Sequence, residues 1–91
     1  MSFYYTYVLK SLSKKTVTYV GYTKSIENRL KLHNEGKGAK FTRGRKWKLI
    51  YMEKFRSKKL AILRERYIKK NRKLRDKIKY SSENKFWKKK T

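Results

Sequence analysis

The sequence predicts a small α/β domain of the α+β type, with a three-stranded antiparallel sheet flanked by helices in the order β-β-α-β-α(-α). Three segments, 3–9, 16–22 and 46–55, are rich in the aromatic and β-branched residues that favour strands. The other segments show helical spacing after serine residues that can act as caps. Because the 91-residue chain has no proline and no linker-like stretch, we expect one domain over residues 1–78. We expect a basic tail over residues 79–91 to be either docked or disordered.

The first two strands form a predicted hairpin. The segments "FYYTYVL" (3–9) and "TVTYVGY" (16–22) are joined by the polar connection "KSLSKK". Successive side chains of a strand point to opposite faces, so Tyr7 and Leu9 share one face while Thr6 and Val8 share the other. Both faces carry large residues, and we therefore expect the sheet to be covered on at least one side.

The first helix carries an unusual pair of polar residues. Ser25 can cap this helix, and Gly36 and Gly38 can end it after about three turns. Arg29 and His33 fall on the same stripe as the apolar residues of the helix, so we expect them to face inward or along a cleft. The alternative is that Arg29 extends past the edge of the core and His33 is a satisfied polar residue near the helix end.

The second helix shows a carboxylate in a similar position. It begins after the capping residue Ser57 and continues to about Lys70, with an apolar side formed by Leu60, Leu63 and Tyr67. A shorter basic helix is expected around residues 73–78.

Glu65 lies in an apolar stripe of this second helix, between Ala61 and Ile68. A glutamate that only increases solubility would lie on the opposite side. The alternative interpretation is an exposed pair with Lys69, one turn away, which would contribute only about 0.3–0.5 kcal/mol.

The charge of the chain indicates a polyanionic partner. There are 29 Lys and Arg residues against 6 Asp and Glu, a formal net charge of +23, which indicates nucleic acid as the default partner. No apolar run is long enough to span a bilayer or to act as a secretory signal, so we expect a cytoplasmic protein that is not associated with a membrane. The chain has no cysteine and one histidine, so a metal site would have to use carboxylate oxygen.

The motifs together resemble the GIY-YIG nuclease superfamily. "YTY" at 5–7, "YVG" at 19–21, Arg29, His33 and Glu65 are similar to its successive signature positions, and the resemblance covers about residues 3–75. The connection "HNEGKGAKFTRGRKWKLIYMEKF" is also similar to that of small stand-alone bacterial members. Thr6 and Tyr5 replace the isoleucine and glycine of the family's first tripeptide.

The resemblance implies a fold, a site and a cofactor. The fold would be that of a GIY-YIG endonuclease, and Tyr7 and Tyr19 would be the two motif tyrosines, together with Arg29. Glu65 would be the single protein ligand to a divalent ion, Mg²⁺ or Mn²⁺, and Gly21 would let the chain pass close beneath the site. The family's late asparagine has no clean match. Asn71 lies only six residues past Glu65, and we leave it out of the site.

The implied activity is metal-dependent DNA endonuclease activity on phosphodiester bonds, with DNA repair or recombination as the candidate setting. Such hydrolysis needs an oriented water molecule and positive charge near the non-bridging oxygens. Tyr7 is the candidate for water activation, and we expect nearby positive charge to favour its phenolate by lowering its pKa. His33 would share the proton transfer or hold a phosphate, and these residues alone leave both roles open.

The connection after the first helix is expected to contact the DNA backbone through four cations, Lys37, Lys40, Arg43 and Arg45. A solvated charged loop is the alternative. For the whole protein, the alternative to catalysis is a non-catalytic basic protein that binds structured RNA or DNA. We expect a monomer or a weak dimer.

Overall fold

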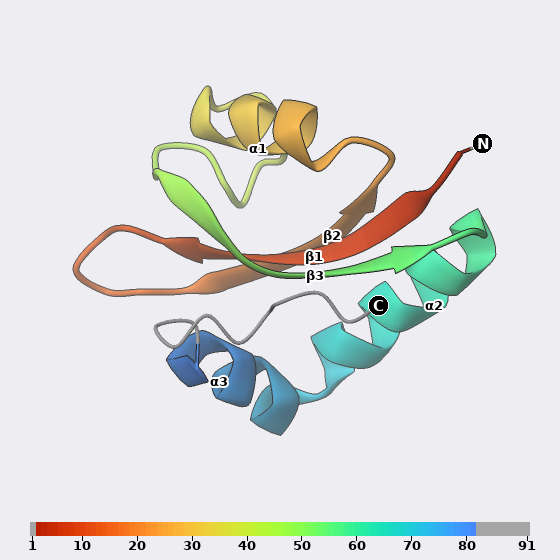
Figure 1. Ribbon diagram of the computed structural model, residues 1–91. Coiled ribbons are helices and arrows are strands. Elements are labelled where there is room, and N and C mark those ends of the chain that lie inside the picture. Colours follow the sequence, from red (N-terminus) through yellow and green to blue (C-terminus); the bar gives the residue numbers. More distant parts are fainter. Residues whose placement is uncertain (1, 82–91) are drawn as a thin grey trace.

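The computed structural model describes residues 2–81, and this part of the chain forms three strands and three helices (Figure 1). Strands β1 (Tyr4–Ser11) and β2 (Thr18–Thr23) form the predicted antiparallel hairpin. Strand β3 (Trp47–Phe55) pairs antiparallel with the other side of β1, so the sheet order is β2-β1-β3. The predicted fold class and element order are confirmed. Residues 82–91 of the expected tail lie outside the described residues.

The helices cover both faces of the sheet (Figure 1). Helix α1 (Ile26–Asn34) lies on one face, and helices α2 (Lys58–Lys70) and α3 (Arg72–Ser81) lie on the other. The side chains of Ser25 and Ser57 accept hydrogen bonds from backbone N–H groups in the first turns of α1 and α2, as predicted. Helix α3 is longer than the expected short helix, since it extends through residue 81.

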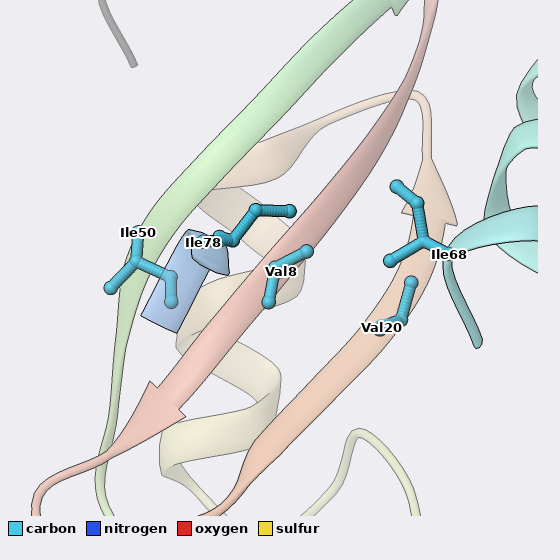
Figure 2. Packing of buried hydrophobic residues seen from close by; sticks show 5 residues of the cluster. All are labelled: Val8, Val20, Ile50, Ile68 and Ile78. Atoms are coloured by element: carbon cyan, nitrogen blue, oxygen red, sulfur yellow. The ribbon is translucent and has the colours of Figure 1, made fainter. Parts of the chain in front are cut away.

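The face under α2 and α3 holds an aliphatic core. Its buried residues come from all three strands and both helices, as Figure 2 shows: Val8, Val20, Ile50, Ile68 and Ile78. The side of α2 that packs on the sheet is thus the stripe with Ala61 and Ile68, both fully buried.

The apolar side expected for α2 is not the buried one. Leu60, Leu63 and Tyr67 are each about half exposed to solvent. The helix carries two apolar stripes, and only one of them can face the sheet.

The face under α1 is built around aromatic residues. Tyr7, Leu9 and Trp47 are buried there, and Leu30 of α1 packs against them. The alternation along β1 therefore directs Val8 toward α2 and α3 and its neighbour Tyr7 toward α1. This alternation places Tyr7 beneath the helix that carries Arg29 and His33.

The two glycines expected to end α1 have different roles. Gly36 has a positive φ of 80°, and backbone bonds from residues 36 and 37 close the end of the helix. Gly38 instead lies against the ring of His33, where a Cβ atom would come within 2.3 Å of Nδ1. Gly38 is therefore needed for close packing and not for ending the helix.

Candidate active site

An open pocket of about 590 Å³ lies along β2, one of the two edge strands of the sheet. Four of the five predicted catalytic residues line it: Tyr7, Tyr19, Arg29 and Glu65. They come from β1, β2, α1 and α2, so residues far apart in the sequence share one surface. The lining also includes two lysines, Lys24 and Lys58, which add positive charge at the rim.

Gly21 makes room for the tyrosines of the pocket. It pairs with Tyr7 across the β1–β2 ladder. A Cβ atom on Gly21 would lie 2.6 Å from the hydroxyl oxygen of Tyr7 and 3.2 Å from Cε2 of Tyr19. Any larger residue would have to displace a Tyr7 ring that is 3% exposed. The chain does pass close beneath the site at this glycine, as the resemblance implied.

His33 lies behind the pocket and not on its surface. It is 1% exposed, and both ring nitrogens have partners: Nε2 lies 2.9 Å from the hydroxyl of Tyr7, and Nδ1 lies 2.9 Å from Oγ1 of Thr42. The Thr42 hydroxyl donates its single proton to the carbonyl of Ala39 at 3.0 Å. Thr42 must therefore accept a hydrogen bond from Nδ1–H of His33, since a hydroxyl has only one proton to donate.

The direction of this hydrogen-bond chain determines the tautomer of the histidine. With its proton on Nδ1, neutral His33 accepts the Tyr7 proton at Nε2. Burial lowers the pKa of His33, and the nearby charge of Arg29 lowers it further, so the ring is neutral near pH 7. A neutral, buried imidazole thus holds the hydroxyl of Tyr7.

In the protein chain alone, the pKa of Tyr7 is raised and not lowered, although the positive charge of Arg29 does act in the expected direction. Burial raises this pKa most, and the neighbouring Tyr19 and Glu65 raise it as well. The charge of Arg29 acts in the opposite direction but is outweighed. Tyr7 is therefore a neutral phenol whose proton already has an acceptor in His33.

Arg29 and Glu65 are charged residues of the pocket, in addition to Lys24 and Lys58. Within residues 2–81, the guanidinium of Arg29 has no carboxylate partner, so it can meet an anion from solution. The carboxylate of Glu65 is 15% exposed and forms a 3.2 Å ion pair with Lys69, which is 52% exposed. The alternative predicted for Glu65, an i,i+4 pair, is therefore present at the same time as its position in the pocket.

The donor set of the pocket fits a hard divalent ion that is held mainly by water and substrate. No group of three or more His, Cys, Asp or Glu side chains gathers within the described part of the chain, so a metal site made only of protein ligands is not formed there. Mg²⁺ is often bound through one carboxylate with water and phosphate oxygens. Glu65 is the carboxylate that lines the pocket.

The predicted DNA-contacting cations lie in the loop of residues 35–46 between α1 and β3. Lys37, Lys40 and Arg43 are exposed and Arg45 is partly exposed, and none of the four lines the pocket itself. The loop reaches the site through other residues, because Thr42 bonds His33 and Phe41 stacks on Tyr19.

Sequence reasoning missed Thr42 and Gly38, the two residues of this loop that hold His33. Thr42 is fully buried, and Gly38 lies against the imidazole ring. A glycine and a threonine within a basic loop show no periodicity that would mark them. Their role depends on how the loop folds back over α1.

Asn71 has a structural role at the junction of α2 and α3. Its side-chain oxygen accepts a 3.0 Å hydrogen bond from the backbone N–H of Leu74, which caps the start of α3. Its amide donates to the hydroxyl of Tyr67. It is not among the residues that line the pocket.

Residues 3–81 match the family model described as the GIY-YIG catalytic domain, and the chain belongs to this family. The family implies a nucleic acid substrate, and its nucleases generally use a divalent metal ion.

The curated relatives are small proteins named UPF0213. One from Clostridium perfringens is 51% identical over 67 residues, which cover 72% of this chain and 70% of the relative. One from Bacillus licheniformis is 50% identical over 68 residues, covering 74% and 68%. One from Natronomonas pharaonis is 46% identical over 67 residues, covering 72% and 76%. No solved structure matches the chain significantly.

The described helices contain no segment that is long and apolar enough to cross a membrane.

Proposed function

We propose that this protein is an endonuclease that hydrolyses phosphodiester bonds in DNA with the help of one Mg²⁺ or Mn²⁺ ion. The observation that supports this proposal is the pocket on β2, in which two tyrosines, an arginine and a carboxylate meet. A role in DNA repair or recombination and a cytoplasmic location are part of the same proposal.

Tyr7 and His33 would activate the attacking water molecule together. The hydroxyl oxygen of Tyr7 takes a proton from water while Tyr7 passes its own proton to Nε2 of His33. Tyr7 remains neutral throughout, so its raised pKa is no obstacle. The hydroxide attacks phosphorus, the bond to the leaving oxygen breaks, and that oxygen takes a proton from solvent.

Arg29 would couple substrate binding to this proton transfer. In the free protein, its positive charge helps to keep the pKa of His33 low. A phosphate bound to Arg29 neutralises that charge, so His33 becomes a better base when substrate is in place. The same guanidinium stabilises the negative charge that accumulates on the phosphate oxygens.

Glu65 would hold the divalent ion. An ion bound there supplies positive charge at the phosphate and lowers the barrier to attack by water. Lys69 would have to release the carboxylate, which costs little because its side chain is half exposed. The loop cations Lys37, Lys40, Arg43 and Arg45 would hold the DNA backbone next to the pocket.

A comparison of two arginine variants tests the proposal. Arg29→Ala removes the arginine of the pocket, whereas Arg66→Ala removes an exposed arginine of α2 that does not line it. Cleavage of branched, duplex and single-stranded DNA is measured with Mg²⁺ and with Mn²⁺. We expect Arg29→Ala to cut at least about 100-fold more slowly, with Arg66→Ala close to the wild type.

DNA affinity is measured on the same two variants. Each loses one positive charge, so their affinities should fall by a similar small factor. Equal cleavage by the two variants would contradict the role of Arg29. If the wild-type protein binds DNA but cuts none of these substrates with either metal, the alternative function applies, which is non-catalytic binding of nucleic acid.

A further inference from the structure

Phe41 is an exposed aromatic residue beside the pocket. Its side chain lies in the loop of residues 35–46 and is 51% exposed. The ring stacks against Tyr19 with a centroid distance of 6.3 Å and an interplanar angle of 21°, and Tyr19 lines the pocket. The exposed surface of Phe41 is therefore adjacent to the place where the scissile phosphate would bind.

The backbone next to Phe41 is held in place by the neighbouring residue Thr42. Thr42 is fully buried, bonds His33 through its hydroxyl, and accepts a 3.0 Å hydrogen bond from the indole of Trp47 at its carbonyl. The ring of Trp47 also contacts Phe41, with centroids 6.2 Å apart. An exposed ring on such a support loses little conformational entropy when a ligand stacks on it.

The charges around Phe41 select the kind of ligand. Residues 36–46 contain five lysines and arginines and no aspartate or glutamate: Lys37, Lys40, Arg43, Arg45 and Lys46. The guanidinium of Arg45 lies 5.6 Å from the ring centroid of Phe41, and in the described residues it has no carboxylate partner. A flat apolar surface with cations around it suits a nucleobase and its phosphates.

We propose that Phe41 stacks on an unpaired base next to the phosphate in the pocket, so that the site prefers strands with unpaired bases over intact duplex. In a duplex, each base is already stacked between its neighbours and offers no free face to the ring. An unpaired base can leave the stack and lie on Phe41. This inference rests on the proposed function, because it names the substrate class of the same site.

Binding measurements without divalent ions test the inference independently of cleavage. Affinities for a labelled single strand and for a blunt-ended, fully paired duplex are measured in EDTA. We expect Phe41→Ala to weaken single-strand binding about 5- to 150-fold, the size of one stacked base, and duplex binding by less than about twofold. Phe41→Trp, which keeps a flat ring, should bind both as the wild type does.

Two controls separate base stacking from packing of the loop. Phe41→Leu keeps apolar contact with Tyr19 and Trp47 but has no flat face, so it should weaken single-strand binding as Phe41→Ala does. Leu63→Ala removes a 50% exposed apolar side chain on the outer side of α2 and should bind like the wild type. A fluorescent base analogue in the strand should be quenched by the wild type and not by Phe41→Leu.

Three results would overturn the inference. They are unchanged single-strand binding by Phe41→Ala, equal weakening for single strand and duplex, and single-strand binding by Phe41→Leu that matches the wild type. If single-strand binding depends on Phe41 but no metal supports cleavage, the proposed nuclease activity fails and base stacking stands. If the protein cuts DNA while Phe41 makes no difference, only the stacking inference fails.

Discussion

The hydroxyl of Tyr7 donates a hydrogen bond to Nε2 of His33 at 2.9 Å, because the other ring nitrogen of His33 already donates to Thr42. This contact joins β1 to α1 beneath the pocket. A tyrosine with a raised pKa and a histidine with a lowered pKa thus form a neutral pair at neutral pH.

Removing the hydroxyl of Tyr7 should stop cleavage without unfolding the protein. Tyr7→Phe keeps the buried ring but leaves Nε2 of His33 without a partner, at a cost of about 1–3 kcal/mol. We expect cleavage to fall by about 10²–10⁴-fold in a single-turnover assay. Tyr51→Phe is the control, since it removes a hydroxyl that bonds Glu53 outside the pocket. A Tyr7→Phe protein that cuts as fast as the wild type would exclude the proton path.

The stability of the protein should fall in mild acid because of His33. Its pKa is about 6.5 in the unfolded chain and lower in the folded protein. Below pH 6.5 or so, the unfolded state therefore binds a proton that the folded state does not, and the free energy of unfolding decreases. Above that pH, His33 does not make the free energy of unfolding depend on pH. Urea unfolding between about pH 5 and 8 measures this slope.

His33→Gln serves as the control for this slope, because it has no titrating ring. As His33 is the chain's single histidine, its ring signals in an NMR titration are also unambiguous. A histidine that titrates at its ordinary pKa in the folded protein would contradict the prediction.

Glu65 should be needed for the metal and not for the fold. Glu65→Gln keeps the shape of the side chain but removes the charge that holds a hard cation, so metal-dependent cleavage should disappear. DNA binding should be unchanged or slightly tighter, because one negative charge near the phosphate is gone. The ion pair with Lys69 contributes little because the lysine side chain is half exposed, and we expect the free energy of unfolding to change by less than about 0.5 kcal/mol.

A second variant tests the competition between Lys69 and the metal. Lys69→Met removes the cation that pairs with Glu65, so half-maximal cleavage should need less Mg²⁺ than in the wild type. If the Glu65→Gln protein is less stable than the wild type and still cuts DNA, Glu65 is not the metal ligand. Its role would then be the ion pair with Lys69.

Gly38 should tolerate no side chain. In Gly38→Ala, the new Cβ atom would lie 2.3 Å from Nδ1 of His33, so the loop or the ring must move. We expect a loss of about 1–3 kcal/mol in stability together with a loss of cleavage. Gly36→Ala is a matched control in the same loop. It has open space around the new atom but a φ of 80°, so it should lose about 1 kcal/mol and keep its activity. Equal activity of the two variants would show that the His33 contact is unimportant.

Local patterns in the sequence were enough to determine the fold class, the hairpin and the two serine caps. Strand alternation and helix capping depend on residues within a few positions of each other, so they can be read without the tertiary structure. The same local spacing placed Arg29 and Glu65 on inward-facing stripes, and both residues line the pocket.

Only the tertiary structure shows which apolar stripe of α2 is buried and which partners His33 has. Helix α2 has two apolar stripes, and only packing on the sheet shows that Ala61 and Ile68 are buried while Leu63 is half exposed. His33 could have faced a phosphate, but the loop that folds over α1 encloses it and pairs it with Thr42. The contacts of α2 with the sheet join elements that are distant in the sequence, and the contact of His33 with Thr42 depends on an irregular loop, so no local period encodes either of them.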